Sequence, residues 1–403
     1  MSPSRRTFLT SGTTLVAAAA TASLASTPAA AQDATPAHSS FDPWVEVYVD
    51  HLRHNVRIIQ QHVASRPILA VIKNNGYGLG VANVGRVFDD EAAITGLAVV
   101  KLHEAHQLRD AGVRKPILLM GPFDEHNLAD AVARDIMPMV YTPIGDTLDG
   151  IATRLQRAVP LHVCIDTGMG RVGVPYGNAP ALIRDLARRS SIAIKGVMTT
   201  LSEDPDLDIE QLRRLLRLAD DLKQAGVDVG LRHAASSFGL FQHRDAFLDM
   251  VRPGMALFGI YSEPQFRTMD LLELRPAVSL KARVAYVKQL QPGDSAGYNR
   301  AYVATRPVWL ATLPVGHADG WPRQAAKGAK VTINGAMYPV IASISASHTI
   351  VELGDEPRCA IGDVATMFDW EEGSRPEDVA AACEGSVYDL TMHLNPLMPR
   401  KVI

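Results

Sequence analysis

Cysteine is scarce in this sequence, and long apolar runs are missing from it. The 403 residues contain 3 cysteines, Cys164, Cys359 and Cys383. Three scattered cysteines cannot all pair, and their spacing is not that of metal ligands, so the sequence predicts neither a disulfide framework nor a metal site. The sequence also lacks a heptad run, a short internal repeat and a stable membrane span. We therefore expect a globular protein without a coiled coil, a solenoid or a membrane anchor.

A strong charge of either sign is also missing. The formal net charge is −3, with 47% hydrophobic and 21% charged residues. A balance this close to neutral gives no long-range field to attract nucleic acid or a membrane surface, so we expect neither as a partner. The composition is that of an ordinary soluble protein and supplies enough apolar residues for a full core.

The first 31 residues have the features of an export signal. Arg5 and Arg6 precede a short stretch of small apolar residues, and "PAAAQ" offers a cleavage site between Ala31 and Gln32. The paired arginines followed by Phe8 resemble the twin-arginine signal, which carries folded proteins; a general secretory signal is the alternative. Export after folding in a reducing compartment would fit the unpaired cysteines. We expect a periplasmic or secreted protein, with a linker over residues 32–43.

Residues 44–272 alternate between strand-like and helix-like segments. Continuous apolar runs such as "PILAVIK", "PILLMG", "LHVCID" and "IAIKGVMT" are separated by amphipathic patterns such as "DIEQLRRLLRLADDLKQAG". Apolar runs of this kind are typical of parallel strands covered by helices. Eight runs in about 230 residues predict a (β/α)₈ barrel. The alternative is an open doubly wound sheet, but the glycine fingerprint expected after its first strand is absent.

The pattern changes over residues 273–403. Short alternating strands follow one another with Gly, Pro and Asn-Gly turns, and "INGAMYPV" carries the strongest hairpin signal. We predict an all-β C-terminal domain. The expected fold class is therefore α/β, a barrel of the TIM type followed by a β domain.

Lys73 ends the apolar run "ILAVIK", and the glycine-rich turn "NNGYGLG" follows it. In a barrel, active-site groups lie at the carboxyl ends of the strands. A lysine there can form a Schiff base if its pKa is lowered, although the same residue could also extend its amine to water from a strand end. Other polar residues end later runs, namely Asp166 with Arg171, Thr199, His233 with Ser236 and Ser237, and Arg252.

Several of these stretches resemble the alanine racemase family. The motifs occur in order over nearly the whole chain: "AVIKNNGYGLG", "IDTGMGRVGV", "RHAASSFG", "MVRPGMALFGIY", "SLKARVAYVKQLQPGDSAGYNRAY", "LPVGHADGWPR" and "VELGD". The resemblance implies pyridoxal 5′-phosphate as cofactor and an amino acid as the small-molecule substrate. It also implies a barrel with a C-terminal β domain, and a head-to-tail homodimer with shared active sites.

The resemblance assigns the two catalytic bases to Lys73 and Tyr298. Lys73 matches the lysine that binds the cofactor covalently and then acts as a base on one face. Tyr298, in "AGYNRAY", matches a tyrosine that reaches the opposite face from the other subunit. Racemisation needs two such groups, because one removes the α-proton and the other returns a proton from the far side. Without the resemblance, Tyr298 would be interpreted as a turn residue.

Cofactor contacts are implied in the same way. Tyr77, Ser237, Gly254, Met255 and Tyr388 match positions around the phosphate, where backbone amides and hydroxyls favour an anion.

Three further positions match residues near the cofactor ring. Arg252 faces the pyridine nitrogen in the family, Arg171 lies near the phenolic oxygen, and His233 orients the arginine. A guanidinium stays protonated and cannot give the ring nitrogen a proton, which suits prompt proton return. A structural salt bridge for Arg252 and a satisfied core histidine for His233 are the alternatives.

The chain departs from the family near the substrate. Cys164 stands where the family often has a carbamylated lysine beside Arg171, and Thr200 replaces a histidine linked to the catalytic tyrosine. "GHADGW" and "SASH" replace "GYADGY" and "CMDQ", and Leu79 replaces the histidine of "YGHG". A thiol cannot form a carbamate, so another group must position Arg171.

The positions that differ from the family motifs predict an altered substrate preference. The candidate substrate-binding residues are Arg171, His317, Ala346 and Ser347, and His348 could also contact a side chain larger than methyl. His317 and His348 could equally be rim residues.

Three functions fit the sequence. The first is an exported amino-acid racemase acting on alanine or a larger amino acid. The second is a lyase, dehydratase, aldolase or decarboxylase on the same scaffold, which the losses at Thr200 and "CMDQ" favour. The third is a non-catalytic pyridoxal-phosphate carrier, against which Tyr298 argues because binding alone needs no second base.

Overall fold

The computed structural model describes residues 41–403. The expected signal of residues 1–31 and the expected linker up to residue 40 lie outside the described residues. Within the described residues, Cys164, Cys359 and Cys383 are free and buried. No helix in this part of the chain combines the length and apolarity that a membrane span requires.

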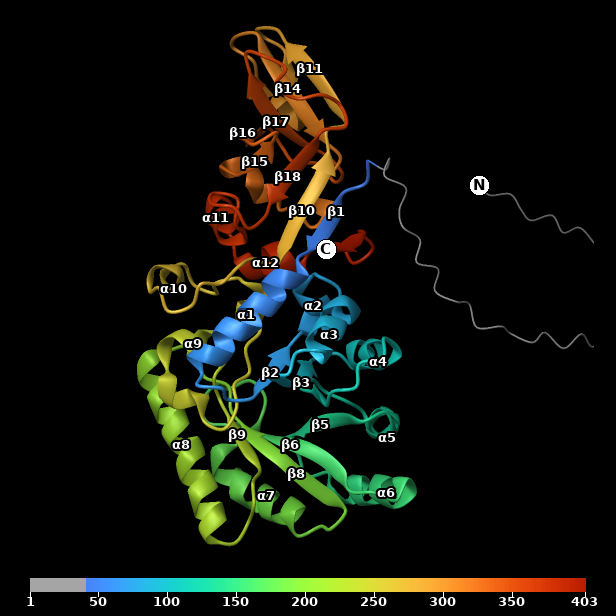
Figure 1. Cartoon of the computed structure of the whole chain (residues 1–403), viewed down its shortest axis with the longest axis vertical. Coiled ribbons are helices and arrows are strands. Elements are labelled where there is room, and N and C mark those ends of the chain that lie inside the picture. Colours follow the sequence, from blue (N-terminus) through green and yellow to red (C-terminus); the bar gives the residue numbers. More distant parts are fainter. Residues whose placement is uncertain (1–40) are drawn as a thin grey trace, which may run out of the picture. The chain divides into compact units, whose positions relative to one another are not determined.

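Parallel strands form the barrel, in the order β2, β3, β4, β5, β6, β8, β9 (Figure 1). All four residues of β2 are buried, as expected for a strand covered by helices. The bounds of the strands, including the short β7 beside β6, are β2 (Ile68–Val71), β3 (Ile94–Val99), β4 (Ile117–Leu119), β5 (Ile136–Val140), β6 (Val159–Asp166), β7 (Val174–Pro175), β8 (Ile192–Met198) and β9 (Leu231–His233).

The barrel closes through a very short eighth segment. Val251 forms a parallel bridge with Ile68, and the N–H groups of Leu69 and Val71 donate to Val251 O and Pro253 O, each at 2.9 Å. The run "MVRPGMALFG" therefore completes the barrel as expected, but Pro253 and a 3₁₀ turn over Met255–Phe258 keep it from forming a longer ladder.

Helices cover the barrel strands, and the label α2 denotes a short turn at the end of β2. They are α1 (Val49–His62), α2 (Lys73–Tyr77), α3 (Val81–Asp89), α4 (Leu102–Asp110), α5 (Glu125–Ala133), α6 (Gly145–Leu155), α7 (Ala179–Ala187), α8 (Pro205–Gln224), α9 (Ser237–Gln242) and α10 (Pro264–Thr268). The longest, α8, begins where the Asp204 side chain accepts the Leu207 N–H and Pro205 takes the first helical position. It buries Leu215, Leu218 and Leu222, one stripe at helical spacing.

The second sheet has the order β11, β14, β17, β16, β15, β18, β10, β1, β19. The predicted hairpin is present, because Asn334 and Gly335 have φ of 51° and 77° between β15 and β16. Its strands and the small β12–β13 pair are β1 (Trp44–Val47), β10 (Val278–Arg283), β11 (Tyr286–Leu290), β12 (Ser295–Ala296), β13 (Tyr302–Val303), β14 (Val308–Leu313), β15 (Lys330–Ile333), β16 (Ala336–Ile341), β17 (Thr349–Gly354), β18 (Val364–Phe368) and β19 (Arg400–Val402).

Two features of this domain differ from the sequence prediction. β1 pairs with β10 and β19, so residues 44–47 belong to the second sheet although they precede the barrel in the chain (Figure 1). The domain is also not purely β, because α11 (Pro376–Ala382) and α12 (Val387–Met392) follow β18. Ser386 starts α12 by accepting the Tyr388 N–H, and this places Tyr388 in its first turn.

Candidate active site

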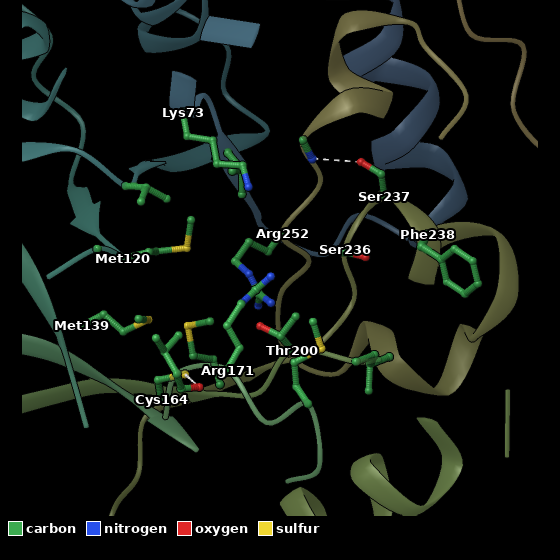
Figure 2. Close-up of a pocket in the computed structure, with 18 of the residues that line it drawn as sticks. Lys73, Met120, Met139, Cys164, Arg171, Thr200, Ser236, Ser237, Phe238 and Arg252 are labelled. Atoms are coloured by element: carbon green, nitrogen blue, oxygen red, sulfur yellow. Dashed lines mark hydrogen bonds between the residues drawn. The ribbon is translucent and has the colours of Figure 1, made fainter. Parts of the chain in front are cut away.

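A cavity of about 620 Å³ lies at the carboxyl ends of the barrel strands. Figure 2 shows Lys73 extending into it toward Arg252. Eight of the residues that the family resemblance assigns to the cofactor or to catalysis line this cavity and are called the cavity set: Lys73, Tyr77, Arg171, Ser237, Arg252, Gly254, Met255 and Tyr388. His233 lies beneath them and contacts Arg252. Lys73 therefore follows the end of a barrel strand, as predicted.

A left-handed turn presents Lys73. After β2, Asn74, Asn75, Gly76 and Tyr77 have φ of 55°, 55°, 61° and 51°, so α2 is a left-handed turn. Asn and Gly tolerate this conformation better than other residues, which explains the "NNG" sequence. A helix of the barrel domain anchors this turn, because the buried Glu104 of α4 accepts the Asn75 N–H at 2.7 Å.

The C-terminal domain holds the other side of the same loop. The Arg400 guanidinium donates to Gly78 O from Nε and Nη2, at 3.1 and 3.0 Å. A Cβ at Gly78 would lie 2.1 Å from Thr391 O, so only glycine allows α12 this close. Leu79 is fully buried, which accounts for an apolar residue where the family has histidine. The lysine loop is thus fixed between the two domains.

The electrostatics around Lys73 favour a neutral amine. Burial lowers the pKa of Lys73, and the positive charges of Arg171 and Arg252 lower it further, while Glu104 opposes them. A lysine with a lowered pKa is a better nucleophile and base near neutral pH.

The phosphate positions form a ring of donors. Ser237 Oγ accepts the N–H groups of Gly254 and Ala256, at 2.9 and 3.1 Å. A Cβ at Gly254 would lie 2.2 Å from Tyr77 Oη, so the glycine makes room for the phenol. Burial raises the pKa of Tyr77, and it raises the pKa of Tyr388 to about 12, so both keep their protons. The two phenols and the serine hydroxyl fit a phosphate group, and the amides of Gly254 and Ala256 orient the serine.

A chain of hydrogen bonds supports Arg252. Its Nη1 is 3.0 Å from His233 Nδ1, its Nη2 donates to Thr199 O at 3.1 Å, and His233 Nε2 is 2.9 Å from His162 Nδ1. A guanidinium only donates, so His233 accepts at Nδ1 and must donate from Nε2 to His162. Both rings are therefore neutral in this arrangement.

The acid–base state of this chain agrees with its hydrogen bonds. Burial lowers the pKa of His233 well below its usual range and that of His162 to about 4. Burial and the nearby Arg171 lower the pKa of Arg252 to about 10, so the guanidinium stays charged at neutral pH. Sequence reasoning missed His162; the signal was its position on β6 two residues from Cys164, which places both side chains on one face.

Cys164 does not replace a carbamylated lysine. Its Sγ lies 3.6 Å from Val172 O, and burial raises the pKa of the thiol to about 11, so it is uncharged. Asp166 shapes the following loop by accepting the N–H groups of Gly168 and Gly170. Within residues 41–403 the Arg171 guanidinium forms no hydrogen bond or ion pair, although it lines the cavity (Figure 2).

The other sequence candidates lie on the C-terminal domain. Tyr298, His317, Ala346 and Ser347, called the β-domain set, do not line the cavity. Tyr298 is 73% exposed, and its turn is held in an unusual conformation by Gly297, Asn299 and Arg300, with φ of 75°, 56° and 53°.

Backbone contacts join the members of the β-domain set. The N–H of His317 donates to Ser345 O, and the N–H of Ala318 donates to Ala346 O, each at 3.0 Å. A Cβ at Gly297 would lie 2.8 Å from Ala342 Cβ, so the Tyr298 turn packs near the same loop. His317 Nε2 is 2.6 Å from Arg323 Nη2.

A buried polar network supports the cavity wall at residues 200–203. Asp208 Oδ1 accepts the N–H groups of Ser202 and Glu203 and the Ser202 hydroxyl, and Asp208 Oδ2 is 3.0 Å from His243 Nε2. Gln211 holds the same stretch by donating to Thr200 O and accepting the Ser202 N–H. Sequence reasoning identified Thr200 only as a departure and missed this network and Glu203.

The fold and the site define an enzyme with a (β/α)₈ barrel that uses pyridoxal phosphate. Residues 47–262 match the N-terminal domain of alanine racemase, and residues 277–402 match its C-terminal domain. The chain belongs to the alanine racemase family.

Relatives and solved structures agree with this assignment. The chain is 33% identical over 340 residues to an alanine racemase of Sorangium cellulosum, with 81% of this chain and 88% of the relative covered. It is 31% identical over 368 residues to one of Desulforamulus reducens, with 89% and 98% covered. The alanine racemase structure from Streptomyces lavendulae is similar with a TM-score of 0.84 and 27% identity, covering 91% of this chain and 98% of that one.

Proposed function

We propose that this chain is a racemase of amino acids in which Lys73 and Tyr298 of the partner subunit move the α-proton. The observation that carries the proposal is the position of Lys73 in the cavity, with its pKa lowered by burial, Arg171 and Arg252. Bound pyridoxal phosphate would withdraw electrons from the amino acid and make its α-proton acidic. The hydroxyl groups of Tyr77, Tyr388 and Ser237 would hold its phosphate, and the Gly254 amide would orient Ser237.

The proton transfers use two atoms on opposite faces. Lys73 Nζ takes the α-proton on one side while Tyr298 Oη supplies a proton on the other. Before the next turnover in the same direction, Lys73 gives its proton to solvent and Tyr298 regains one from solvent. The charged guanidinium of Arg171 would attract the substrate carboxylate. Arg252 stays protonated, and the neutral rings of His233 and His162 keep it in place, so this end of the cavity donates no proton. This favours prompt return of the α-proton over side reactions.

The proposal includes a homodimer. Tyr298 is exposed on a turn with unfavourable backbone angles, and such strain is typical of functional positions. The β-domain set does not line the cavity of its own chain, so a second copy of the chain would have to supply it. An isolated monomer with full activity would contradict the shared site.

Deuterium exchange tests the reaction type. The purified enzyme with pyridoxal phosphate is incubated with single L-amino acids in heavy water. A racemase gives both enantiomers, with deuterium at the α-carbon of the inverted product. Exchange without inversion, or release of ammonia or an aldehyde, would indicate the alternative chemistry on the same scaffold. Lys73→Ala is the control and should abolish exchange.

We also propose export through the twin-arginine pathway, on the basis of Arg5, Arg6 and the short apolar stretch that follows. Three free buried cysteines support folding before export. Replacing both arginines by lysine should retain the protein in the cytoplasm, as measured by cell fractionation. Unchanged export of this variant would point to the general secretory route.

A further inference from the structure

Glu203 is a charged residue of the cavity wall that the reaction described above does not use. It lines the same cavity as Lys73 and Arg171. The methyl side chain of alanine has no group that the Glu203 carboxylate could bind. A carboxylate at this place therefore calls for an explanation based on the substrate.

The backbone holds Glu203 in place at a measurable cost. Its φ is 67°, a left-handed conformation that disfavours residues other than glycine, asparagine and aspartate. The buried Asp208 stabilises this turn by accepting the Glu203 N–H at 3.0 Å, and Gln211 and His243 fix the surrounding network. The backbone at Glu203 is thus fixed by hydrogen bonds, while the residue itself is exposed.

The Glu203 carboxylate has no partner of its own. Within the described residues it accepts no hydrogen bond and forms no ion pair, and the same is true of the Arg171 guanidinium. Glu203 is an exposed residue that lines the cavity. Desolvation and the negative charges of Glu263 and Asp208 raise the pKa of its carboxyl group, against the opposing effect of Arg171. One cavity therefore contains an open cation and an open anion that do not neutralise each other by direct contact.

Part of the cavity lining is apolar and adaptable. Met120, Met139, Met169 and Met198 line the cavity. Methionine side chains are flexible and fill irregular gaps, so they can accommodate an aliphatic stem. Figure 2 shows Met120 and Met139 on the side of the cavity that faces Arg171.

We propose that Glu203 selects amino acids with a cationic side chain, such as lysine or ornithine. This inference rests on the proposed racemase function and names its substrate class. Arg171 binds the α-carboxylate, the methionines contact the aliphatic stem, and Glu203 binds the terminal cation. An acidic side chain would be repelled, and a neutral one would leave the carboxylate unpaired.

The test compares L-lysine with L-norleucine, which has a stem of similar length but no charge. Racemisation of each by the complete enzyme with pyridoxal phosphate is followed by chiral chromatography. We expect wild type to have a kcat/KM for lysine at least about tenfold above that for norleucine, because a charge-assisted contact contributes this much. Glu203→Gln should reduce this lysine-to-norleucine ratio about tenfold or more, mainly through KM.

The ratio of kcat/KM for lysine to that for norleucine separates a change in specificity from a general loss of activity, because a damaged enzyme would act more slowly on both substrates. Glu263→Gln is the matched control: it removes a nearby negative charge that does not line the cavity, and it should change the ratio less than about twofold. Charge reversal in Glu203→Lys should shift preference toward L-2-aminoadipate. A binding measurement supplements turnover: in the slow Tyr298→Phe background, calorimetry should show weaker lysine binding when Glu203→Gln is added.

Two results would overturn the inference while leaving a racemase in place. One is a wild-type ratio near one, and the other is a ratio that Glu203→Gln does not change. A wild type that racemises no amino acid would instead overturn the proposed function, and this inference with it.

Discussion

The cavity set and the β-domain set are built in opposite ways. Around the cavity, Tyr77, Arg252 and Gly254 are buried, and each is fixed by a close contact or a hydrogen bond from a neighbouring element. In the β-domain set, Tyr298 is exposed, and backbone contacts between loops hold its neighbours. The residues proposed to hold the cofactor are therefore brought together within one chain, whereas the proposed second base lies on its surface.

This difference explains the departure from the family motif at Ser345–His348, but not the departures at the buried Leu79 and Cys164. At Gly254 an added Cβ would lie only 2.2 Å from Tyr77 Oη, so this residue cannot change without moving its neighbours. Exposed loops such as Ser345–His348 tolerate replacement, and they can alter what the enzyme accepts without disturbing the cofactor. The following predictions test this contrast, beginning with the largest effect.

Removing the Lys73 amine should cause the largest loss of racemisation. Lys73→Ala is expected to lower racemisation about 10⁴-fold or more, because both the covalent link to the cofactor and one base are lost. Borohydride treatment followed by peptide mass analysis should attach the cofactor to the wild-type peptide only. Lys195→Ala, an exposed residue of β8, serves as the control and should keep full activity. Covalent attachment that persists in Lys73→Ala would refute the assignment.

Changing the β-domain set should affect proton transfer but not cofactor binding. Tyr298→Phe is expected to lower kcat about 10³-fold, the range of a lost acid–base group, while cofactor absorbance stays that of wild type. Tyr286→Phe, an exposed tyrosine on β11, is the matched control. If Tyr298→Phe instead released the cofactor, the separation between the two sets would be wrong.

A single methyl group should weaken the phosphate cradle. Gly254→Ala places its Cβ 2.2 Å from Tyr77 Oη, so we expect cofactor affinity to fall about 100-fold. Gly150→Ala in α6 meets no atom within 4 Å and should leave affinity unchanged. Equilibrium titration of the cofactor measures both. Equal cofactor affinities for the two variants would show that the close contact between Gly254 and Tyr77 is not needed for cofactor binding.

The neutral histidines should make the protein sensitive to mild acid. In the folded state the pKa of His162 is lowered to about 4 from its ordinary value of 6.5, so between these values the unfolded chain binds more protons. Stability is therefore present above pH 6.5 and lost as pH falls toward 4. Between pH 7 and pH 5 this histidine should contribute a loss of about 2 kcal/mol in unfolding free energy.

His162→Gln removes the titrating group but keeps an acceptor for His233, so part of this pH dependence should disappear. Urea unfolding of both proteins at the two pH values measures the difference. An identical loss of stability in wild type and variant would exclude His162 as its source.

The sequence allowed the barrel, the place of Lys73 at a strand end and the family to be predicted because they depend on local pattern. Continuous apolar runs such as that of β2 require covering helices, and Lys73 stands where such a strand ends. It could not show that β1 joins the second sheet, since that pairing depends on residues distant in the chain. The His233–His162 contact and the Glu203 turn were missed for the same reason: each depends on side chains from several elements meeting in space.

The pairing of β1 with β19 also constrains the order in which the molecule can be completed. Val45 lies opposite Arg400, and both strands belong to one sheet. During synthesis the first strand must therefore wait until the ribosome has released nearly the last residues before it gains this neighbour. The same Arg400 holds Gly78 in the lysine loop, so a chain truncated by a few residues would lose both a sheet edge and a support of its catalytic loop.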